Sequence, residues 1–433
     1  MLTTGGRLAE RPPATARAGR AKRTVTDLAV FGGPAAFREE LSVGRPTIGD
    51  RARLLARIGE ALDRRWLSND GPLVREFERR VAEVAGVRHA VATNNATIGL
   101  QLAIRSAELT GEVIVPAMTF AATAHAVRWL GLDPVFCDVD PATGNLAPAA
   151  VEAVLTPRTT GIIGVHLWGR PCPVRELEAL AAARGLTLLF DSAHAIGVTS
   201  AGRPVGGFGS AEVFSFHATK VVNAFEGGAV LTDDDALAER VRSLRNFGFD
   251  DAREVQWAGT NGKMAESSAA MGLTSLEAMP RTVAHNRMLH HAYRAGLAGV
   301  PALRLAGFDE RETNNYQYAI VEADPAACGL SPDDLLEVLR AEGVIGRRYF
   351  APGCHQMRPY RTPGTAVPVL PHTEALAAKV LALPTGTQLG PDDARVICDI
   401  LRVAVDHGPL TAHRVRERRA AATPAHAPDG HPR

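Results

Sequence analysis

An alternation of short apolar runs with helical segments, from about residue 48 to residue 231, constrains the fold of this chain more than any other feature. The apolar runs are HAVAT, EVIVP, DPVFCDV, TGIIGVHL, LTLLFD, AEVFSF and GAVLT. Several are apolar throughout, which is typical of strands that crossover helices bury on both faces. We therefore predict an α/β fold with a mainly parallel, doubly wound sheet whose ligands bind beyond the carboxyl ends of the strands.

The segment GPLVREFERRVAEVAG carries the clearest helix signal in the chain. Its residues Leu73, Phe77 and Val81 recur with the spacing of one helical face. Asp70 is a candidate cap at the start and Gly86 marks the end. The segment therefore predicts an amphipathic helix against the sheet.

The length of the chain and a change of pattern after about residue 232 predict two domains. At 433 residues the chain is longer than one ordinary domain. We expect a large domain over residues 29–265, and then a linking helix and a smaller C-terminal α+β domain over residues 266–412. The Arg- and Ala-rich ends, residues 1–28 and 413–433, are predicted to be a disordered arm and a disordered tail.

The composition excludes several classes of function. Formal charges nearly cancel at +1, and no basic stripe interleaved with aromatic residues predicts a nucleic-acid surface. No apolar stretch reaches the roughly 18 residues of a membrane span. The cysteines form no C-x-x-C pair and no disulfide framework, which favours a cytoplasmic protein without a metal site and with small-molecule partners. These cysteines are Cys137, Cys172, Cys328, Cys354 and Cys398.

Asp191 and Lys220 are the most informative pair of residues, because each follows a predicted buried strand. Both should project at the carboxyl edge of the sheet, where one ligand could touch them. A lysine can join an aldehyde cofactor covalently, and a carboxylate can keep a pyridine ring protonated. The alternatives are a solvated loop lysine and a helix cap. Lysine occurs at only three other positions, Lys22, Lys263 and Lys379, which favours the cofactor interpretation.

An anion site is predicted where the strand that ends near Thr93 leads into a helix. Helix starts present free N–H groups to phosphate, and the hydroxyl of Thr97 could cap the helix or bind the anion. An ordinary Asn- and Thr-rich cap is the alternative. Ser215, on the strand that leads to Lys220, offers a second hydroxyl.

Phe120 and His194 follow two other predicted strands at the same edge. The ring of Phe120 could stack on a pyridine ring, although an aromatic residue there is more often part of the core. His194 comes one turn after Asp191, near the phenolic oxygen of such a cofactor. A histidine that caps a helix is the alternative.

Several blocks, in the same order, are similar to those of a known family. They are NNAT, PAMTF, FCDVD, FDSAHA, FSFHATK, EGGAV, RNFG and GTNGKMAE. From about Phe31 to beyond Ile400 the chain resembles the DegT/DnrJ/EryC1/StrS aminotransferases. These are fold type I enzymes that use pyridoxal 5'-phosphate (PLP) and aminate nucleotide-linked ketosugars.

The resemblance implies a role for each matched residue. Lys220 would form the internal aldimine with PLP and Asp191 would pair with the pyridine nitrogen. Phe120 would stack on the ring, with His194 near its 3'-oxygen. The phosphate would be held by Ala96, Thr97 and Ser215, and by Asn261 of a neighbouring subunit, so the active unit would be a homodimer with a shared site.

This chain departs from the family pattern at two positions. Ala96 stands where the family usually has glycine, so the phosphate turn lacks the left-handed freedom of glycine. His194 stands where the family often has glutamine, so the resemblance does not define its protonation state. Members of the dehydratase type replace the lysine by histidine, and the presence of Lys220 therefore favours transamination.

The expected reaction moves an amino group, by analogy from L-glutamate, onto a ketone through pyridoxamine phosphate, with Lys220 as general acid and base. We favour C-4 of a dTDP-4-keto-6-deoxyhexose in natural-product deoxyaminosugar biosynthesis, over C-3. The segment IGRRYFAPGCHQ supplies four candidate substrate contacts, unless its arginines form ion pairs between subunits. They are Arg347, Arg348, Tyr349 and His355.

Two other functions stay open at this stage. The first is amination of a cyclitol ketone such as an inosose, which tight binding of dTDP would argue against. The second, from another class, is a sensor that binds PLP or a sugar nucleotide without catalysis. An NAD enzyme is disfavoured because no G-x-G-x-x-G motif leads from a strand into a helix.

Overall fold

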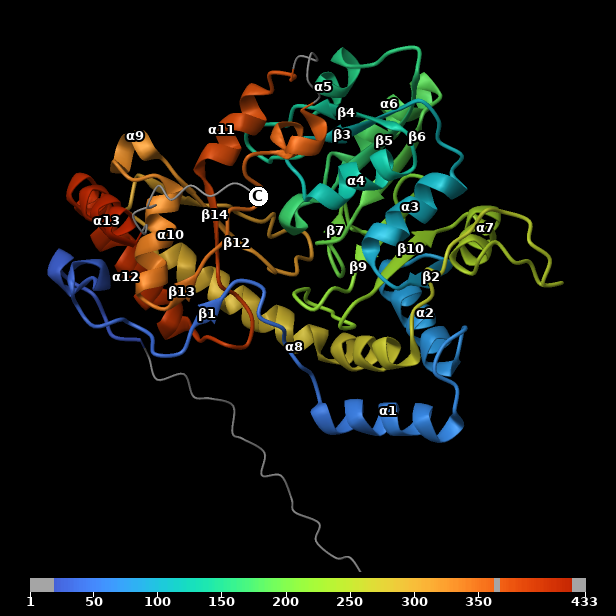
Figure 1. The fold of residues 1–433 in the computed structure, drawn as a ribbon, viewed down its shortest axis with the longest axis horizontal. Helices are drawn as coiled ribbons and strands as arrows, with labels where there is room; N and C mark the ends of the chain where they lie inside the picture. Colours follow the sequence, from blue (N-terminus) through green and yellow to red (C-terminus); the bar gives the residue numbers. More distant parts are fainter. Residues whose placement is uncertain (1–18, 362–366, 423–433) are drawn as a thin grey trace, which may run out of the picture.

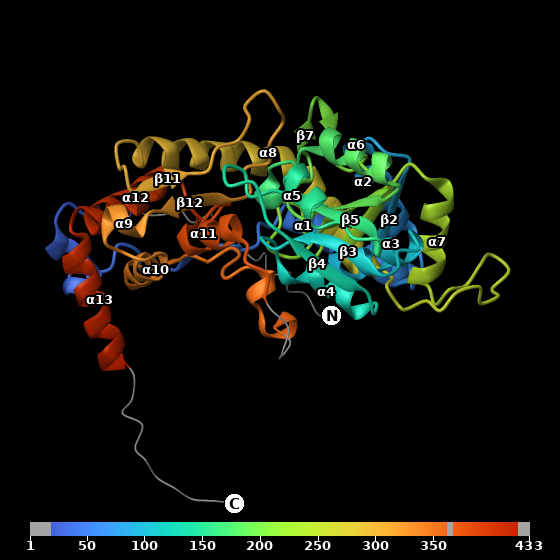
Figure 2. The same cartoon turned by 90° about the horizontal axis from the view of Figure 1, so that it is seen from above.

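The computed structural model describes residues 19–361 and 367–422. The chain forms a large and a small domain, and one long helix, α8 (Glu266–Gly296), runs through both (Figure 1). Figure 2, seen from above, separates the two domains along this helix. In the part of the chain that the structure describes, no helix combines the length and hydrophobicity that a bilayer crossing requires.

The large domain contains a seven-stranded sheet of order β2-β10-β9-β6-β5-β3-β4. The seven apolar runs of the sequence all form its strands, as predicted. All neighbours pair in parallel except β10, which is antiparallel to both β2 and β9. No helix crosses over between β9 and β10, and a strand that returns directly must run antiparallel. The strands are β2 (His89–Thr93), β3 (Glu112–Pro116), β4 (Asp133–Cys137), β5 (Thr159–Val165), β6 (Thr187–Asp191), β9 (Ala211–Ser215) and β10 (Gly228–Thr232).

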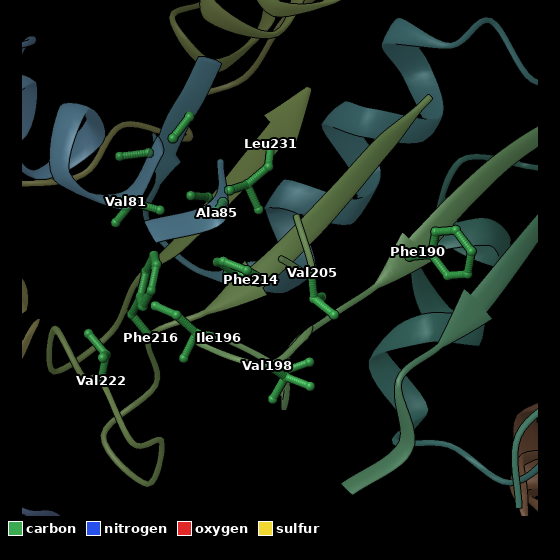
Figure 3. Packing of buried hydrophobic residues seen from close by; sticks show 14 of the residues in the cluster. Val81, Ala85, Phe190, Ile196, Val198, Val205, Phe214, Phe216, Val222 and Leu231 are labelled. Carbon is green, nitrogen blue, oxygen red and sulfur yellow. The ribbon is translucent and has the colours of Figure 1, made fainter. Parts of the chain in front are cut away.

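Helices bury both faces of this sheet, which explains why the strands lack polar alternation. On β10, Ala229 and Leu231 join one hydrophobic cluster and Val230 joins another. The first cluster, part of which Figure 3 shows, packs α2, α5, α6 and the start of α8 on one face. The second packs α3, α4 and α7 on the opposite face. These helices are α2 (Pro72–Ala85), α3 (Ala96–Ser106), α4 (Ala121–Trp129), α5 (Pro148–Ala153), α6 (Val174–Arg184) and α7 (Asp235–Arg245).

The predicted helix at residues 71–86 is α2, but its start differs from the prediction. Gly71 occupies the N-cap position, and no side chain of its own segment caps the helix. Instead the buried carboxylate of Glu266, at the start of α8, accepts hydrogen bonds from the N–H groups of Leu73 and Val74. Asp70 is therefore not the cap, because a residue remote in sequence supplies it.

The small domain packs helices against a three-stranded antiparallel sheet of order β11-β12-β14. A second small sheet pairs β1 in parallel with β13. Leu289 and Tyr293, in the second half of α8, lie in the core of this domain. The elements are β1 (Leu41–Ser42), β11 (Leu303–Leu305), β12 (Ala319–Ala323), α9 (Pro325–Cys328), α10 (Pro332–Ala341), β13 (Val344–Ile345), α11 (Pro371–Lys379), β14 (Val380–Leu383), α12 (Pro391–Asp406) and α13 (Gly408–Ala422).

The remaining elements are short or lie outside these layers. Helix α1 (Arg51–Arg64) runs beside α8, and β7 (Thr199–Ser200) pairs with β8 (Arg203–Pro204) in a hairpin. Five 3₁₀ turns complete the list: η1 (Val25–Asp27), η2 (Ala29–Phe31), η3 (Leu167–Gly169), η4 (Cys354–Gln356) and η5 (Arg358–Tyr360).

The prediction of disordered ends is wrong for the terminal residues that the structure describes. Residues 19–28 pack on the small domain, where Lys22 and Glu342 form a buried ion pair with a 2.8 Å contact. Residues 413–422 belong to helix α13. The domain boundary shifts as well, because Phe37 and Leu41 lie in the core of the small domain. The rest of the two predicted ends, residues 1–18 and 423–433, lies outside the described residues.

Candidate functional site

Asp191 and Lys220 lie at one edge of the large sheet because their strands are parallel neighbours. Asp191 is the last residue of β6 and pairs with Val213 of β9. Strand β9 ends at Ser215, and the loop that follows carries Lys220. The carboxyl ends of β2 and β3 point to the same edge, so the helix starts at Ala96 and Phe120 face it too. The predicted convergence at this edge is confirmed.

Asp191 is 5% exposed, and both oxygens of its carboxylate accept hydrogen bonds. The hydroxyl of Thr123, on α4, donates to Oδ2 at 2.7 Å, and the N–H of Ala193 donates to Oδ1 at 3.1 Å. Burial raises the pKa of Asp191 above its ordinary value, while these hydrogen bonds and the charge of Lys220 oppose the rise. A buried carboxylate with such partners is suited to hold a cationic ring nitrogen.

The amine of Lys220 lies beside a pocket with a largely polar lining. Burial lowers its pKa to about 8, although the charge of Asp191 opposes that shift. Its Nζ donates a hydrogen bond to the hydroxyl of Tyr318 at 3.3 Å, beside β12. A lysine with a pKa near neutrality is uncharged often enough to attack a carbonyl group and to carry protons.

His194 is neutral and its tautomer is defined by the backbone. The N–H of Trp168 donates to Nδ1 of His194 at 3.2 Å, so the ring proton resides on Nε2. Burial, and next the charge of Lys220, lowers the pKa of His194 well below its usual range. The ring lies parallel to Phe350, with centroids 5.9 Å apart, and edge-on to Tyr318 at 4.9 Å. His194 can therefore offer one hydrogen bond from Nε2.

The turn predicted to bind an anion lies at the N-terminus of α3. The helix begins at Ala96, earlier than expected, and Asn95 caps it by accepting a hydrogen bond from the N–H of Ile98 at 2.9 Å. The hydroxyl of Thr97 is therefore not needed as a cap. Gly228 of β10 passes so close that a Cβ there would lie 2.6 Å from the nitrogen of Ala96. The free N–H groups of this turn and the nearby β9 terminus can hold an anion.

The other predicted cofactor contacts differ in their surroundings. Phe120 is the N-cap residue of α4 and is 58% exposed, so its ring is free to cover a ligand. Ser215 is buried at the end of β9. Asn261 has an exposed side chain, and its backbone lies beside the phosphate turn, where the N–H of Asn94 donates to the carbonyl oxygen of Gly262 at 2.8 Å.

A pocket opens beside Lys220, between the two domains. Arg45, Asn286, Gln317, Tyr318 and Tyr349 contribute polar groups to its lining. A shallower hollow adjoins this pocket and forms its mouth. Of the four candidate substrate contacts, Tyr349 lines both the pocket and the mouth, and Arg347 lines the mouth.

Arg348 and His355 are not brought to this pocket, contrary to the prediction. Arg348 turns into the small domain, where it pairs with Asp333 at 2.9 Å and donates to the carbonyl oxygen of Ala377. His355 is fully buried, and its Nε2 lies 3.3 Å from a carboxylate oxygen of Glu374. Successive residues of a chain point in different directions, so only part of the arginine-rich segment can face the site.

Sequence reasoning missed several residues of the site. Thr123 carries no signal of its own, since a threonine within a helix is usually unremarkable. Tyr318 lies within the predicted smaller domain, far in sequence from the strands of the sheet, and Arg45 lies far upstream of every predicted strand of the sheet. Only the meeting of the two domains brings Arg45 and Tyr318 to Lys220.

Comparison with known proteins agrees with this arrangement. The profile of the DegT/DnrJ/EryC1/StrS aminotransferase family matches residues 49–402. A dTDP-4-amino-4,6-dideoxy-D-glucose transaminase of Escherichia coli is 33% identical over 81% of this chain and 95% of its own length. The enzyme of that name from Shigella dysenteriae is 34% identical over 77% of this chain and 91% of its own length.

Solved structures extend the likeness. The crystal structure of DesI in the presence of its TDP-sugar product has a TM-score of 0.87 and 58% sequence identity, and covers 91% of this chain and 100% of that one. Streptomyces venezuelae DesV, in complex with a ketimine intermediate, has a TM-score of 0.76 and 32% identity over 81% of this chain and 94% of that one. The protein thus belongs to the DegT/DnrJ/EryC1/StrS aminotransferase family.

Proposed function

We propose that this enzyme uses PLP to move an amino group from L-glutamate onto C-4 of a dTDP-linked 4-keto-6-deoxyhexose. The observation that carries the proposal is the placement of Asp191 at the end of β6 and of Lys220 in the loop after the neighbouring strand β9, at one edge of the sheet, with Lys220 lining the pocket. The likeness to a structure containing a TDP-sugar product, and to two transaminases named for a 4-amino-4,6-dideoxy sugar, supports the substrate.

The residues at this edge fit PLP in charge and in shape. Gly228 packs directly against the start of α3, whose free N–H groups suit a phosphate group, and Thr97 and Ser215 add hydroxyls. The exposed ring of Phe120 can cover one face of the cofactor. His194 offers its Nε2 proton to an oxygen acceptor, as the 3'-oxygen of PLP would be.

Bound PLP supplies an electron sink for the charge that develops at the carbon losing its proton. The amine of Lys220 would anchor the cofactor covalently and, once displaced, would act as the group that carries the proton. The carboxylate of Asp191 would hold the ring nitrogen in its protonated form. The burial of Asp191 strengthens its pairing with a positive charge.

Two arginines at the mouth of the pocket, which Glu39 and Glu40 also line, are suited to bind the diphosphate of a nucleotide sugar. Arg45 lines both the pocket and its mouth, and Arg347 lies at the mouth with Tyr349. Guanidinium groups bind phosphate oxygens with two hydrogen bonds, and a tyrosine can bond to a sugar hydroxyl.

The active unit that we propose is a homodimer in which Asn261 of one copy reaches the phosphate of the other. The segment between α7 and α8 extends away from the body of the molecule (Figure 1) and exposes Phe247, Phe249 and Trp257. A cluster of exposed aromatic residues is typical of a surface that another chain covers. The five cysteines are free and buried, which suits our proposal of a reducing cytoplasm as the working compartment.

The decisive experiment compares the visible absorption of the purified wild type with that of Lys220→Ala and Lys379→Ala. Lys379 lies on the surface of the small domain, so its loss is the matched control. We expect the wild type and the control to show the band of lysine-bound PLP, and L-glutamate to convert it to the shorter-wavelength pyridoxamine form. Lys220→Ala should lack the lysine-bound band.

The second half of the reaction is tested by adding dTDP-4-keto-6-deoxyglucose to the glutamate-treated enzyme. Mass spectrometry should detect the amino sugar nucleotide, and NMR of the product should place the amino group at C-4. An amino group at C-3, or turnover of an inosose without dTDP, would contradict the proposed substrate. PLP bound without any turnover would indicate a sensor.

A further inference from the structure

Two threonines form a hydrogen-bonded chain that ends on the carboxylate of Asp191. The hydroxyl oxygens of Thr119 and Thr123 lie 2.8 Å apart, and the hydroxyl of Thr123 lies 2.7 Å from Oδ2 of Asp191. Thr119 and Thr123 are 1% and 0% exposed. Water therefore does not replace these hydrogen bonds, and each hydroxyl depends on its neighbour.

The direction of this chain follows from the number of protons available. Both oxygens of Asp191 accept hydrogen bonds, one from Thr123 and one from the N–H of Ala193. A threonine hydroxyl has one proton, and that of Thr123 is used on Asp191. Thr119 must therefore donate to Thr123, so both hydroxyl dipoles point toward the carboxylate and reinforce each other.

The helix itself does not require these hydroxyls. Phe120 occupies the N-cap position of α4, where serine or threonine is usual, and no side chain caps this helix. The turn before it is instead held by the small domain, where the N–H of Cys354 donates to the carbonyl oxygen of Ala117 at 2.7 Å and the Cys354 thiol donates to that of Thr119 at 3.2 Å. The geometry thus fixes the position of the chain relative to Asp191.

We propose that Thr123, and Thr119 through it, are positioning residues that hold Asp191 ionised and aimed at the ring nitrogen of the cofactor. The inference rests on the proposed function, since it requires a pyridine ring at this edge. A buried carboxylate with fewer donors binds a proton more strongly, so it would draw the proton from the ring nitrogen. The ring would then lose positive charge and withdraw fewer electrons.

Replacing a threonine removes none of the other ionisable groups that interact with Asp191. They are Lys220 after β9, His166 after β5 and Tyr318 just before β12. His166 accepts a hydrogen bond at Nδ1 from the N–H of Cys172 at 2.9 Å, and its Nε2 lies 3.2 Å from Glu212. Neither contact involves a threonine of the chain, so a change at Thr123 acts on Asp191 directly.

The test is a pH titration of the visible band of the PLP-loaded enzyme, which reports the proton on the nitrogen that joins Lys220 to the cofactor. A positively charged ring lowers the pKa of that nitrogen, so Thr123→Val should raise it. From the strength of a hydrogen bond to a charged group, we expect a rise of about one pH unit and a roughly tenfold slower glutamate half-reaction. Thr119→Val should produce a smaller shift in the same direction.

Two control variants distinguish the effect of the hydrogen bond to Asp191 from an effect of side-chain packing. Thr123→Ser keeps the hydroxyl and should restore the wild-type pKa. Thr232 lies at the end of β10 that is remote from Gly228 and the site, and its buried hydroxyl donates to the carbonyl oxygen of Ser210 at 2.8 Å. Thr232→Val removes this hydroxyl and should leave the pKa unchanged. If Thr123→Val does not fold, the pKa values of Thr119→Val and Thr123→Ser are compared instead. A raised pKa in Thr119→Val together with a wild-type pKa in Thr123→Ser would support the inference, and equal values would refute it.

The outcomes distinguish this inference from the proposed function. A wild type that binds no PLP refutes the function and with it the inference. A wild type with the expected band, whose valine variants are less stable but titrate as the wild type does, refutes the inference alone. The same holds if Thr123→Ser shifts as far as Thr123→Val.

Discussion

Replacing Lys22 by methionine should release the N-terminal segment from the small domain. The ammonium group of Lys22 uses its three protons on Glu342, at 2.8 Å, and on the carbonyl oxygens of Asp27 and Pro34, both at 2.6 Å. The lysine and glutamate side chains are 1% and 0% exposed. Methionine fills similar volume but leaves the charge of Glu342 buried without its partner.

The free-energy cost of Lys22→Met depends on the hydrogen bonds that Glu342 retains. Breaking a buried ion pair at one side typically costs about 3–5 kcal/mol. Glu342 retains hydrogen bonds from the N–H groups of Ala29 and Ala36, at 2.7 and 2.8 Å, which favours the lower end of that range. We therefore expect the segment to open about 3 kcal/mol more readily, on the order of a hundredfold.

Hydrogen–deuterium exchange of peptides covering residues 24–37 measures this opening directly, because the amides of Ala29 and Ala36 bond to Glu342. The matched control is Lys379→Met, since Lys379 pairs with Asp324 at 3.9 Å on the surface and should contribute less than about 0.5 kcal/mol. A second replacement, Glu342→Leu, should recover much of the loss by removing the unpaired charge. Exchange in Lys22→Met that accelerates less than about fivefold would refute the reasoning.

Three further predictions concern the site. The rate at which Lys220 of the cofactor-free enzyme reacts with PLP should rise with pH around a midpoint of about 8, because burial disfavours the charged amine. Stopped-flow absorption measures this rate, and a midpoint near 10 would contradict the prediction. Gly228→Ala should lower the free energy of unfolding in urea by about 1–3 kcal/mol and weaken PLP binding in fluorescence titrations, because the added Cβ would meet the backbone of Ala96. Wild-type values in both assays would argue against the close approach. Arg45→Ala should raise KM for the nucleotide sugar about tenfold or more in steady-state assays while kcat changes little, and a change in kcat alone would exclude a binding role.

Much of the large domain could be predicted from local patterns. Each strand of the sheet is an apolar run that needs no partner to be recognised, and α2 has a clear apolar stripe and a glycine stop. The edge shared by Asp191 and Lys220 also followed, because parallel strands bring their carboxyl ends together. The direction of β10 did not follow, since it depends on how the chain returns after Ser215.

The errors share one cause, which is that the deciding partner lies far away in sequence. Lys22 lies in an Arg- and Ala-rich stretch that composition alone marks as disordered, and only Glu342 makes it part of the structure. The guanidinium group of Arg348 is suited to bind phosphate, but the direction of its side chain depends on the carboxylate of Asp333. Glu266, rather than Asp70, caps α2 for the same reason.

The sequence by itself determined the class of fold and the family, and it indicated the residues that we propose for the chemistry, because apolar periodicity and short motifs are local properties of the chain. Only the tertiary structure decided how those residues are tuned. Thr123 of α4 supplies the donor on Asp191, the backbone of Trp168 defines the tautomer of His194, and burial lowers the pKa of Lys220. Such effects depend on the distances between groups and on the exclusion of water, and the folded chain alone sets both.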